Sequence, residues 1–569
     1  MTDELKGVLL NSFNGGLATK VKSWQLKPNQ SPDIRNFDLD YISGSSLLKR
    51  NGFVKYPTAA TAYSAISTAT GILSLYVYRN TTAGTIKTIA QASLPGSPAT
   101  TALYYDNGSA WAKFSGSDAL TTGKRMRYAT VNDTLYFVNG SANGQTTGGL
   151  KKWDGSNYTN VIANTPLGAY FICFNLSRLW QASSDAYPSR VWGSALATNG
   201  TPTPEDYTTD PGTNTVTYDI QKGDGDYING IVPRNDGLVI FKRWSIHILL
   251  GNKPTNFTVR IIHPDIGCVN PDTIAIIENV IFFESLDGIY CVTPDNRVMK
   301  ISDNIQPTFD AMQSKTTKPV SGTYKNQYWM SYYNTGSTAN NRALVLAYRL
   351  PAWVDYTGIQ ADCYFYDKTS DIFMAGSPTA GIVYVLNTGT TDDQTALNGG
   401  ITDSDVTITV TSTAGFLSAG TILIGSEQIT YTGVSSTTFT GCTRGANGTT
   451  KASHITAAVV YVPITASYET PAQVFEADDR DKRLRKAYLN ATTGTGRSLS
   501  VDHKIDTVLA GQAQTVSLAP VASEIVTSQS INFPQLAEGK YLALVISDTS
   551  TTANEIYNIS MYGKIQPLR

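Results

Sequence analysis

Carboxylates are the side chains of this sequence with the widest chemical range, because two of them suffice for glycoside hydrolysis and several can hold a metal ion. Acidic residues gather at four places: Asp38/Asp40, Asp224/Asp226, Asp392/Asp393 and Glu476/Asp478/Asp479. The segment Asp224-Gly225-Asp226 could serve a calcium ion, but the longer loop pattern with a terminal Glu is absent. We interpret this segment as a turn, and we expect no catalytic, cofactor-binding or metal-binding residues.

Histidine and cysteine are too scattered to predict a zinc centre. The histidines are His247, His263, His454 and His503, with no pair four residues apart. The cysteines are Cys173, Cys268, Cys291, Cys363 and Cys442, with no Cys-x-x-Cys. An odd number at wide spacing predicts reduced, buried thiols in a protein made in a cytoplasm. The sequence leaves a Cys–His dyad open, but it has neither a nucleophile elbow nor a phosphate loop. We therefore expect a protein that is not an enzyme.

The chain that must fold to position any such site carries few charged residues. Charged residues make up 16% of the 569 residues, and Lys+Arg 44 against Asp+Glu 45 gives a net charge of -1. No global basic field is present to hold nucleic acid or an anionic membrane. The N-terminus does not have the pattern of a signal peptide, and no apolar run is long enough for a transmembrane helix.

The pattern from residue 65 to 395 predicts short strands separated by tight turns. Asn-Gly and Asp-Gly pairs such as Asn139-Gly140 and Asp287-Gly288 separate β-branched and aromatic runs, which is typical of hairpins. The segment 131–138 resembles the segment 277–283, as a repeated strand–turn–strand unit would. We predict an all-β fold with a propeller-like core of repeated antiparallel sheets. A plain sandwich or several irregular sheets remain alternatives.

The amino-acid composition of the sequence changes after residue 395. Residues 396–463 form a block rich in Thr and Gly without Trp, and residues 464–569 return to longer strand patterns. We predict that 396–463 is an inserted small β module and that 464–569 completes the core or a platform. The block from Val406 to Thr450 resembles a small β module that recurs in phage structural proteins.

Residues 1–64 are predicted to form an N-terminal arm with a fixed docking site. The segment Phe13-Asn14-Gly15-Gly16-Leu17 is followed by a Trp24-to-Asp40 stretch and by Leu48-to-Phe53. Gly15-Gly16 permits a sharp reversal, and Pro28 and Pro32 keep the chain between them extended. On this interpretation, deletion of residues 1–56 abolishes assembly and leaves the β core folded.

The order of these leader residues resembles the opening of the nozzle (tail tubular B-type) proteins of short-tailed bacteriophages. The resemblance implies a virion tail protein, made in the host bacterial cytoplasm, that forms a six-fold ring. The ring would contact the tail adaptor and the tail fibre or spike proteins, and DNA would pass its lumen without sequence-specific binding during ejection. Contact with the host cell surface is a further expectation. The resemblance implies these interface residues: Phe13, Gly15, Gly16, Leu17, Trp24, Pro28, Pro32, Asn36, Arg50 and Gly52.

Three other functions stay open on the sequence. A receptor-binding or glycan-degrading tail protein would use some of the 32 tyrosines to stack on sugars and would form a trimer. Another virion component, such as a head decoration or a long-tail hub protein, is supported only by residues 396–463. The third alternative is a cellular propeller-type binding protein, although this sequence lacks the WD-type Gly-His…Trp-Asp spacing.

Overall fold

The computed structural model describes residues 5–40, 44–56, 66, 68–96, 100–115, 120, 123–140, 150–161, 164–196, 204–208, 214–315, 317–334, 336–494, 497–518, 526–533, 537–550 and 554–566. The described residues are almost entirely strands and turns, with a short helix α1 (Gln306–Asp310) and the 3-10 turns η1 (Ser23–Gln25), η4 (Asp303–Ile305) and η5 (Ala446–Gly448). None of the helices in these residues has both the length and the apolar character needed to cross a lipid bilayer. The all-β prediction is confirmed.

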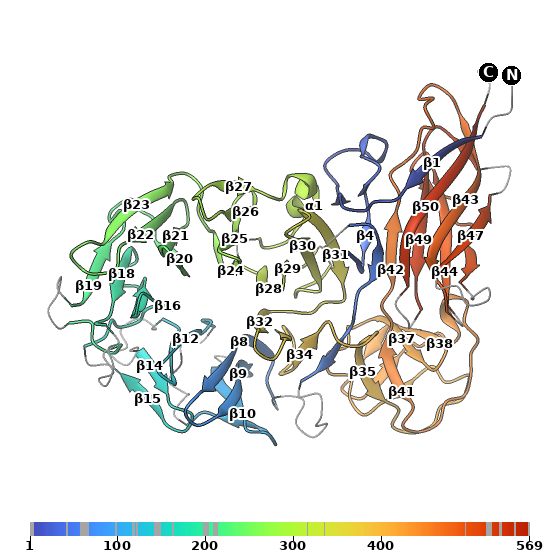
Figure 1. The fold of residues 1–569 in the computed structure, drawn as a ribbon. Coiled ribbons are helices and arrows are strands. Elements are labelled where there is room, and N and C mark those ends of the chain that lie inside the picture. Colours follow the sequence, from blue (N-terminus) through green and yellow to red (C-terminus); the bar gives the residue numbers. More distant parts are fainter. Residues whose placement is uncertain are drawn as a thin grey trace.

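Seven four-stranded antiparallel units of the described chain form a β-propeller, seen on the left of Figure 1. Blade 1 contains β8 (Gly71–Asn80), β9 (Thr85–Leu94), β10 (Thr100–Asp106) and β11 (Trp111–Lys113), and blade 2 contains β12 (Arg127–Val131), β13 (Thr134–Val138), β14 (Leu150–Trp153) and β15 (Tyr158–Val161). Blade 3 contains β16 (Phe171–Asn175), β17 (Arg178–Ala182), β18 (Arg190–Gly193) and β19 (Val216–Asp219), and blade 4 contains β20 (Ile228–Arg234), β21 (Gly237–Lys242), β22 (Ile246–Leu250) and β23 (Thr258–His263).

The remaining blades complete the ring. Blade 5 contains β24 (Asn270–Ile277), β25 (Val280–Ser285), β26 (Gly288–Val292) and β27 (Val298–Lys300), and blade 6 contains β28 (Val320–Tyr324), β29 (Gln327–Tyr332), β30 (Arg342–Ala347) and β31 (Ala352–Thr357). Blade 7 joins β32 (Cys363–Asp367), β33 (Ile372–Gly376) and β34 (Val383–Leu386) to β7 (Phe53–Lys55) from the leader. The first strands of neighbouring blades contact each other around the ring, and β32 contacts β8. The ring is therefore closed by a strand from the leader.

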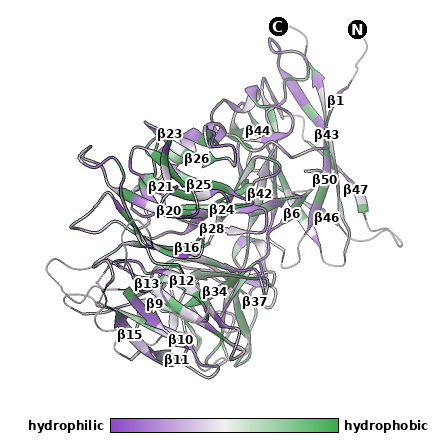
Figure 2. Ribbon diagram, turned by 60° about the vertical axis from the view of Figure 1, so that its left-hand side comes forward, coloured by the Kyte–Doolittle hydropathy of each residue, from purple (hydrophilic) through white to green (hydrophobic). Residues whose placement is uncertain are grey.

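Local sequence explains why these segments form blades. The middle strands β21, β25 and β29 are buried along their whole length, because neighbouring blades cover both faces of each sheet. The similar segments 131–138 and 277–283 form the first hairpins of blades 2 and 5. Both turns have two residues at positive φ, which is the geometry that matches the twist of a tight hairpin. In Figure 2 hydrophobic colouring gathers on the blade strands and hydrophilic colouring marks many loops.

A β-sandwich lies beside the propeller, on the right of Figure 1. One sheet contains β1 (Lys6–Leu10), β5 (Phe37–Leu39), β6 (Leu47–Lys49), β43 (Lys482–Thr492), β47 (Val526–Asn532), β48 (Glu538–Gly539) and β50 (Glu555–Ile565). The other contains β4 (Ile34–Arg35), β42 (Ala466–Glu469), β44 (Ser498–Ile505), β45 (Val508–Leu509), β46 (Gln514–Ser517) and β49 (Leu542–Asp548). Alternate residues of β43 and β50 face the second sheet in a shared apolar core.

The leader connects the two large domains. Its strand β4 pairs with β31 of blade 6 on one side and with β42 of the sandwich on the other, so one sheet runs from the propeller into the sandwich. The short strands β2 (Gly16–Leu17) and β3 (Gln30–Ser31) pair in parallel, and β2 packs against β31. In Figure 1 the blue leader passes between the two domains and reaches both. The boundary predicted after residue 64 lies outside the described residues, and β7 before it belongs to blade 7.

The segment between β34 and β42 forms a module with its own core. Its two sheets contain β35 (Asp392–Ala396), β41 (Val459–Val462), β37 (Gly420–Ile424) and β38 (Glu427–Tyr431), and β36 (Ile408–Thr409), β40 (Thr438–Thr440) and β39 (Gly433–Val434). The first and last strands, β35 and β41, pair with each other, so the module leaves and rejoins the chain at one place. The inserted β domain that the sequence predicts over 396–463 is present in the structure, and its strands run from Asp392 to Val462.

Candidate functional site

A cavity of the propeller opens on the face where the first strands of the blades begin, which we call the entry face. This axial cavity has a volume of about 680 Å³. Its lining includes one residue at or just before the first strand of each blade: Leu73, Arg127, Phe171, Ile228, Asp272, Lys318 and Asp362. Two smaller cavities of about 240 and 200 Å³ share Arg127 and Pro271 with it, so the hollow continues between the first strands.

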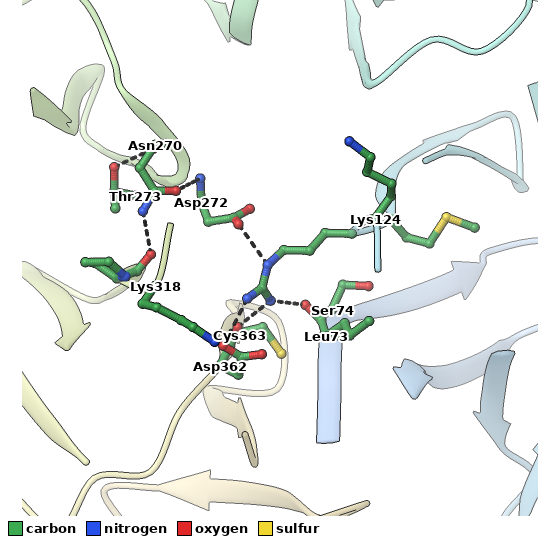
Figure 3. Close-up of polar contacts among 12 residues, drawn as sticks. Leu73, Ser74, Lys124, Asn270, Asp272, Thr273, Lys318, Asp362 and Cys363 are labelled. Atoms are coloured by element: carbon green, nitrogen blue, oxygen red, sulfur yellow. Dashed lines mark hydrogen bonds and ion pairs between the residues drawn. The ribbon is translucent and has the colours of Figure 1, made fainter. Parts of the chain in front are cut away.

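An arginine crosses the ring at the floor of the axial cavity. Arg125, which precedes β12, lies with its Nε 2.8 Å from Oδ2 of Asp272 in blade 5. Its Nη2 lies 3.0 Å from Oδ1 of Asp362, which precedes blade 7, and its Nη1 donates to the backbone carbonyl of Leu73 in blade 1. Figure 3 shows Leu73, Asp272 and Asp362 around one guanidinium group, with dashed lines that mark its contacts. Blades that are distant in sequence are therefore joined through one guanidinium group.

The charges of this cluster balance one another. Burial disfavours the ionised form of Asp272, but Arg125 and Arg127 outweigh burial and lower its pKa. Burial raises the pKa of Asp362 despite the attraction of Arg125. Burial opposes the charge of Arg125, but the two carboxylates outweigh it and raise the pKa of the guanidinium. Since both carboxylates are bound by Arg125, neither is presented alone to a substrate as a general acid or base.

Aromatic side chains surround the opening of the axial cavity. The Tyr170 hydroxyl donates to Oδ1 of Asp185 at 2.5 Å, and the Lys124 ammonium lies 4.9 Å from the centre of the Tyr170 ring. Tyr227, which also lines the cavity, is 39% exposed. The Arg243 guanidinium lies 5.6 Å from the Tyr227 ring and 4.8 Å from the ring of Trp244.

The loop that carries Trp244 is held by a carboxylate that the sequence analysis singled out. Asp226 accepts hydrogen bonds from the backbone N–H groups of Arg243 and Trp244, at 3.2 and 3.1 Å. Its neighbour Asp224 forms an ion pair with the buried Lys242 at 2.5 Å. The Asp-Gly-Asp segment is thus a turn, as predicted, and its carboxylates fix the β21–β22 connection.

The structure does not bring the four acidic groups of the sequence together. Asp38 is half-buried and accepts a hydrogen bond from Gln327, and desolvation raises its pKa to about 6. Asp392 pairs with Arg50, whereas Glu476 forms a surface ion pair with Lys6. Within the described residues, no three His, Cys, Asp or Glu side chains are arranged to hold a metal ion. All five cysteines are buried and unpaired.

Sequence reasoning missed Arg125, Asp272 and Asp362. They are distant in the chain, but each stands just before or at the start of a blade's first strand. An alignment of the blades against one another is the signal that could have found them, since equivalent positions of a propeller repeat meet at one face.

The leader residues assigned to an interface lie mostly inside the chain. Phe13, Gly16, Leu17, Asn36, Arg50 and Gly52 are buried, Gly15, Trp24 and Pro32 are half-buried, and Pro28 is exposed. Phe13 packs edge-on against Tyr468 of the sandwich, with ring centres 5.4 Å apart. Trp24 stacks on Tyr541 at 4.4 Å. The buried side chains cannot form a subunit interface while they occupy these positions.

The glycines of the leader are needed for close backbone contacts. Gly16 has a φ of +53°, and a Cβ there would lie 2.5 Å from the backbone oxygen of Trp353. A Cβ at Gly52 would lie 1.9 Å from the backbone oxygen of Thr391. The leader therefore contacts the chain at positions where only glycine fits.

A second buried charge network stabilises the inserted module. Glu427 accepts hydrogen bonds from Arg444, from His454 and from the backbone N–H groups of Gly445 and Ala452. Burial opposes its ionisation, but the bonds from Arg444 and His454 lower its pKa to about 2. His454 is thereby assigned a structural role that sequence spacing did not indicate.

Glu284 on β25 makes the stability of the propeller depend on pH. Its side chain is fully buried, one oxygen accepts a hydrogen bond from Asn270 at 3.3 Å, and burial raises its pKa to about 8. In the unfolded chain the Glu284 carboxyl has a lower pKa, so the folded chain binds its proton more tightly. The contribution of this proton to the free energy of unfolding is complete below pH about 4.5, and it falls by about 1.4 kcal/mol per pH unit as the pH rises toward 8.

We expect Glu284→Gln to remove this pH dependence and to make the protein more stable than the parent at pH 8. The urea midpoints of both proteins between pH 5 and pH 9, followed by intrinsic fluorescence, measure this difference in stability. Glu278→Gln, an exposed position of the same hairpin, is the control and should leave the pH profile unchanged. Parallel profiles of Glu284→Gln and the parent would contradict the assignment.

Comparison with known proteins adds little beyond the fold. No protein-family model and no curated protein matches the chain. Among solved structures, it is similar to the extracellular domain of a putative one-component system from B. thetaiotaomicron, with 10% identity and a TM-score of 0.39, over 78% of this chain and 60% of that chain. The chain thus spans about three fifths of that domain.

Two further solved structures are similar to the chain at comparably low sequence identity and with lower TM-scores. The Neurospora crassa Pan2 WD40 domain shows 9% identity and a TM-score of 0.34, over 60% of this chain and 95% of that chain. An exo-beta-1,3-galactanase from Phanerochaete chrysosporium shows 10% identity and a TM-score of 0.26, over 78% of this chain and 98% of that chain. Such distant similarity carries no argument about activity, substrate or partners. What the structure and the comparisons establish is a β-propeller-containing, all-β chain.

Proposed function

We propose that this chain is a non-enzymatic virion protein, the nozzle subunit of a short phage tail, which forms a ring through which the genome is ejected. The observation that carries the proposal is the leader, whose order of residues resembles that of the nozzle proteins. Five of the motif positions have a definite architectural role: Phe13 in the core, Gly16 and Gly52 at close contacts, and Asn36 and Arg50 in a buried network. The motif is thus tied to this arrangement of propeller and sandwich.

The leader's burial changes where the proposed ring contact lies. From the sequence, the leader and the C-terminal strands are the candidates for this contact, but the buried leader side chains are unavailable to a second copy. Exposed apolar side chains remain on the sandwich, at Leu5, Leu9 and Leu48 from the leader and at Val508, Leu509 and Val526 from the C-terminal strands. We assign the contact between copies to the sandwich, because a closed ring needs two complementary patches on each subunit.

The charge of the chain fits a passage for DNA without tight binding. A net charge of -1 supplies no excess of cations to neutralise phosphates, so DNA would not be held in the lumen. The same property fits virion localisation in a tail that must release its genome.

The test is the mass of the purified protein by light scattering, with negative-stain images of the protein alone and with its tail adaptor. We expect a six-fold ring with a central hole. A stable trimer, or no ring in the presence of the adaptor, would contradict the proposal. The trimer would favour a receptor-binding tail protein.

A further inference from the structure

The axial cavity has the size and chemistry of a site for a polar ligand. Its volume of about 680 Å³ lies inside the range of about 300–1,000 Å³ typical of small-molecule sites. Its lining combines aromatic rings with hydroxyl, amide and charged groups, including Tyr170, Ser184, Asp185 and Asn229. A ligand with many hydroxyl groups could exchange hydrogen bonds with donors and acceptors at once.

Two partly exposed aromatic rings extend this site beyond the cavity. Tyr227 lines the cavity and is 39% exposed, and Trp244 is 42% exposed. Arg243 lies against both rings, and Asp226 holds the backbone of the loop, so the rings are positioned without a ligand. Flat aromatic faces are apolar surfaces edged by polar atoms, which match the C–H faces and hydroxyl edges of a pyranose ring.

The charges at the cavity floor favour a neutral ligand. Arg125 and Arg127 are paired with Asp272, and Arg125 also with Asp362. These two guanidinium groups and two carboxylates balance, so the floor has neither an excess positive charge for a phosphate chain nor an unpaired carboxylate for a cation. The paired groups still have polar edges facing the cavity, which can bind hydroxyl groups in fixed directions.

We propose that the axial cavity and the rim formed by Tyr227 and Trp244 bind a neutral oligosaccharide. One sugar unit occupies the cavity near Tyr170 and Asp185, and the following sugar units lie over Tyr227 and Trp244. A concave, polar cavity favours a saccharide over a protein surface, which would need a larger area of flat contact. Binding involves no bond cleavage, because the carboxylates of the floor are tied to Arg125.

The experiment is calorimetric titration of the full chain with cello-, chito-, malto- and galacto-oligosaccharides, and with an oligogalacturonate as the acidic comparison. We expect at least one neutral oligosaccharide to bind and the oligogalacturonate to bind no better. Tyr227→Ala and Trp244→Ala should each weaken binding by about tenfold, whereas Tyr227→Phe should retain it. Both positions are partly exposed, so folding should be preserved in all three variants, and circular dichroism checks this.

The control is Phe174→Ala, since Phe174 is 38% exposed on β16 but lies near the turn opposite the entry face. This variant should bind like the parent. The proposal is overturned by no binding of any saccharide at millimolar concentration, by a preference for the oligogalacturonate, by cleavage of the ligand, or by binding that Tyr227→Ala and Trp244→Ala leave unchanged. A partner protein that competes for the rim while no saccharide binds would also overturn it. Ring formation is a separate measurement, so this proposal and the nozzle proposal can fail independently.

Discussion

A chain that lacks residues 1–56 is expected not to fold, in contrast to the expectation from sequence that the β core survives this deletion. Eight apolar leader side chains lie in the main core at 5% exposure or less: Leu10, Phe13, Leu17, Ile34, Phe37, Leu39, Leu47 and Phe53. Burying each contributes about 1.5–3 kcal/mol. Their combined loss, about 12–24 kcal/mol, is as large as or larger than the whole net stability of a typical domain, about 5–15 kcal/mol.

The deletion also removes the strand pairings through which β1, β4, β6 and β7 join the rest of the chain. Blade 7 loses β7 and leaves the edge of β34 unpaired, and the sheet between β31 and β42 loses β4. Open strand edges favour aggregation. We expect the deleted protein to be insoluble or rapidly digested by trypsin, with the native tryptophan fluorescence lost. A soluble, protease-resistant product with a cooperative thermal transition would show that the leader is an appendage.

A second deletion controls for the mere loss of chain length. Residues 397–458 can be replaced by an Asn-Gly turn, because Ala396 and Val459 are antiparallel partners at the base of the module. The module has its own core, so its removal should leave the propeller and sandwich folded. If both deletions unfold the protein equally, the argument from the leader's buried side chains is not supported.

The propeller was predictable because its signals are local. Turn residues such as Asn132-Asp133 and the β-branched runs beside them act over a few positions, and they indicate hairpins wherever they occur. The number of blades was not predictable in the same way. The connections within blades vary in length, as between β18 and β19, and blade 7 takes its fourth strand from the leader.

The functional residues were harder to predict than the fold. Arg125 meets Asp272 and Asp362 only because the ring brings blades 2, 5 and 7 to one axis. Nothing in the local sequence of any one of them indicates the other two. The leader shows the same limit: its pattern was recognisable, but its pairing with β34 and β42 depends on contacts across hundreds of residues.

Replacing Arg50 by Ala should cost about 3–5 kcal/mol of unfolding free energy, the range for breaking a buried ion pair. Arg50 and Asp392 are each 4% exposed, and their two hydrogen bonds measure 2.8 and 2.5 Å. Arg50 also donates to Oδ1 of Asn36, which has a positive φ and holds the leader to Thr357 and Thr465. Loss of the guanidinium leaves a carboxylate and an amide oxygen buried without this donor.

Urea unfolding measures the effect, with Arg297→Ala as the matched control. Arg297 pairs with Asp295 at the surface, where an ion pair contributes about 0–1 kcal/mol. Arg50→Lys should recover only part of the loss, because an ammonium cannot reproduce the bidentate contact. The double variant Arg50→Ala with Asp392→Ala should be more stable than Arg50→Ala alone, since it leaves no buried charge unpaired. If Arg50→Ala shifts the midpoint no more than Arg297→Ala does, the buried pair does not hold the leader, and the leader's attachment then rests on its apolar side chains alone.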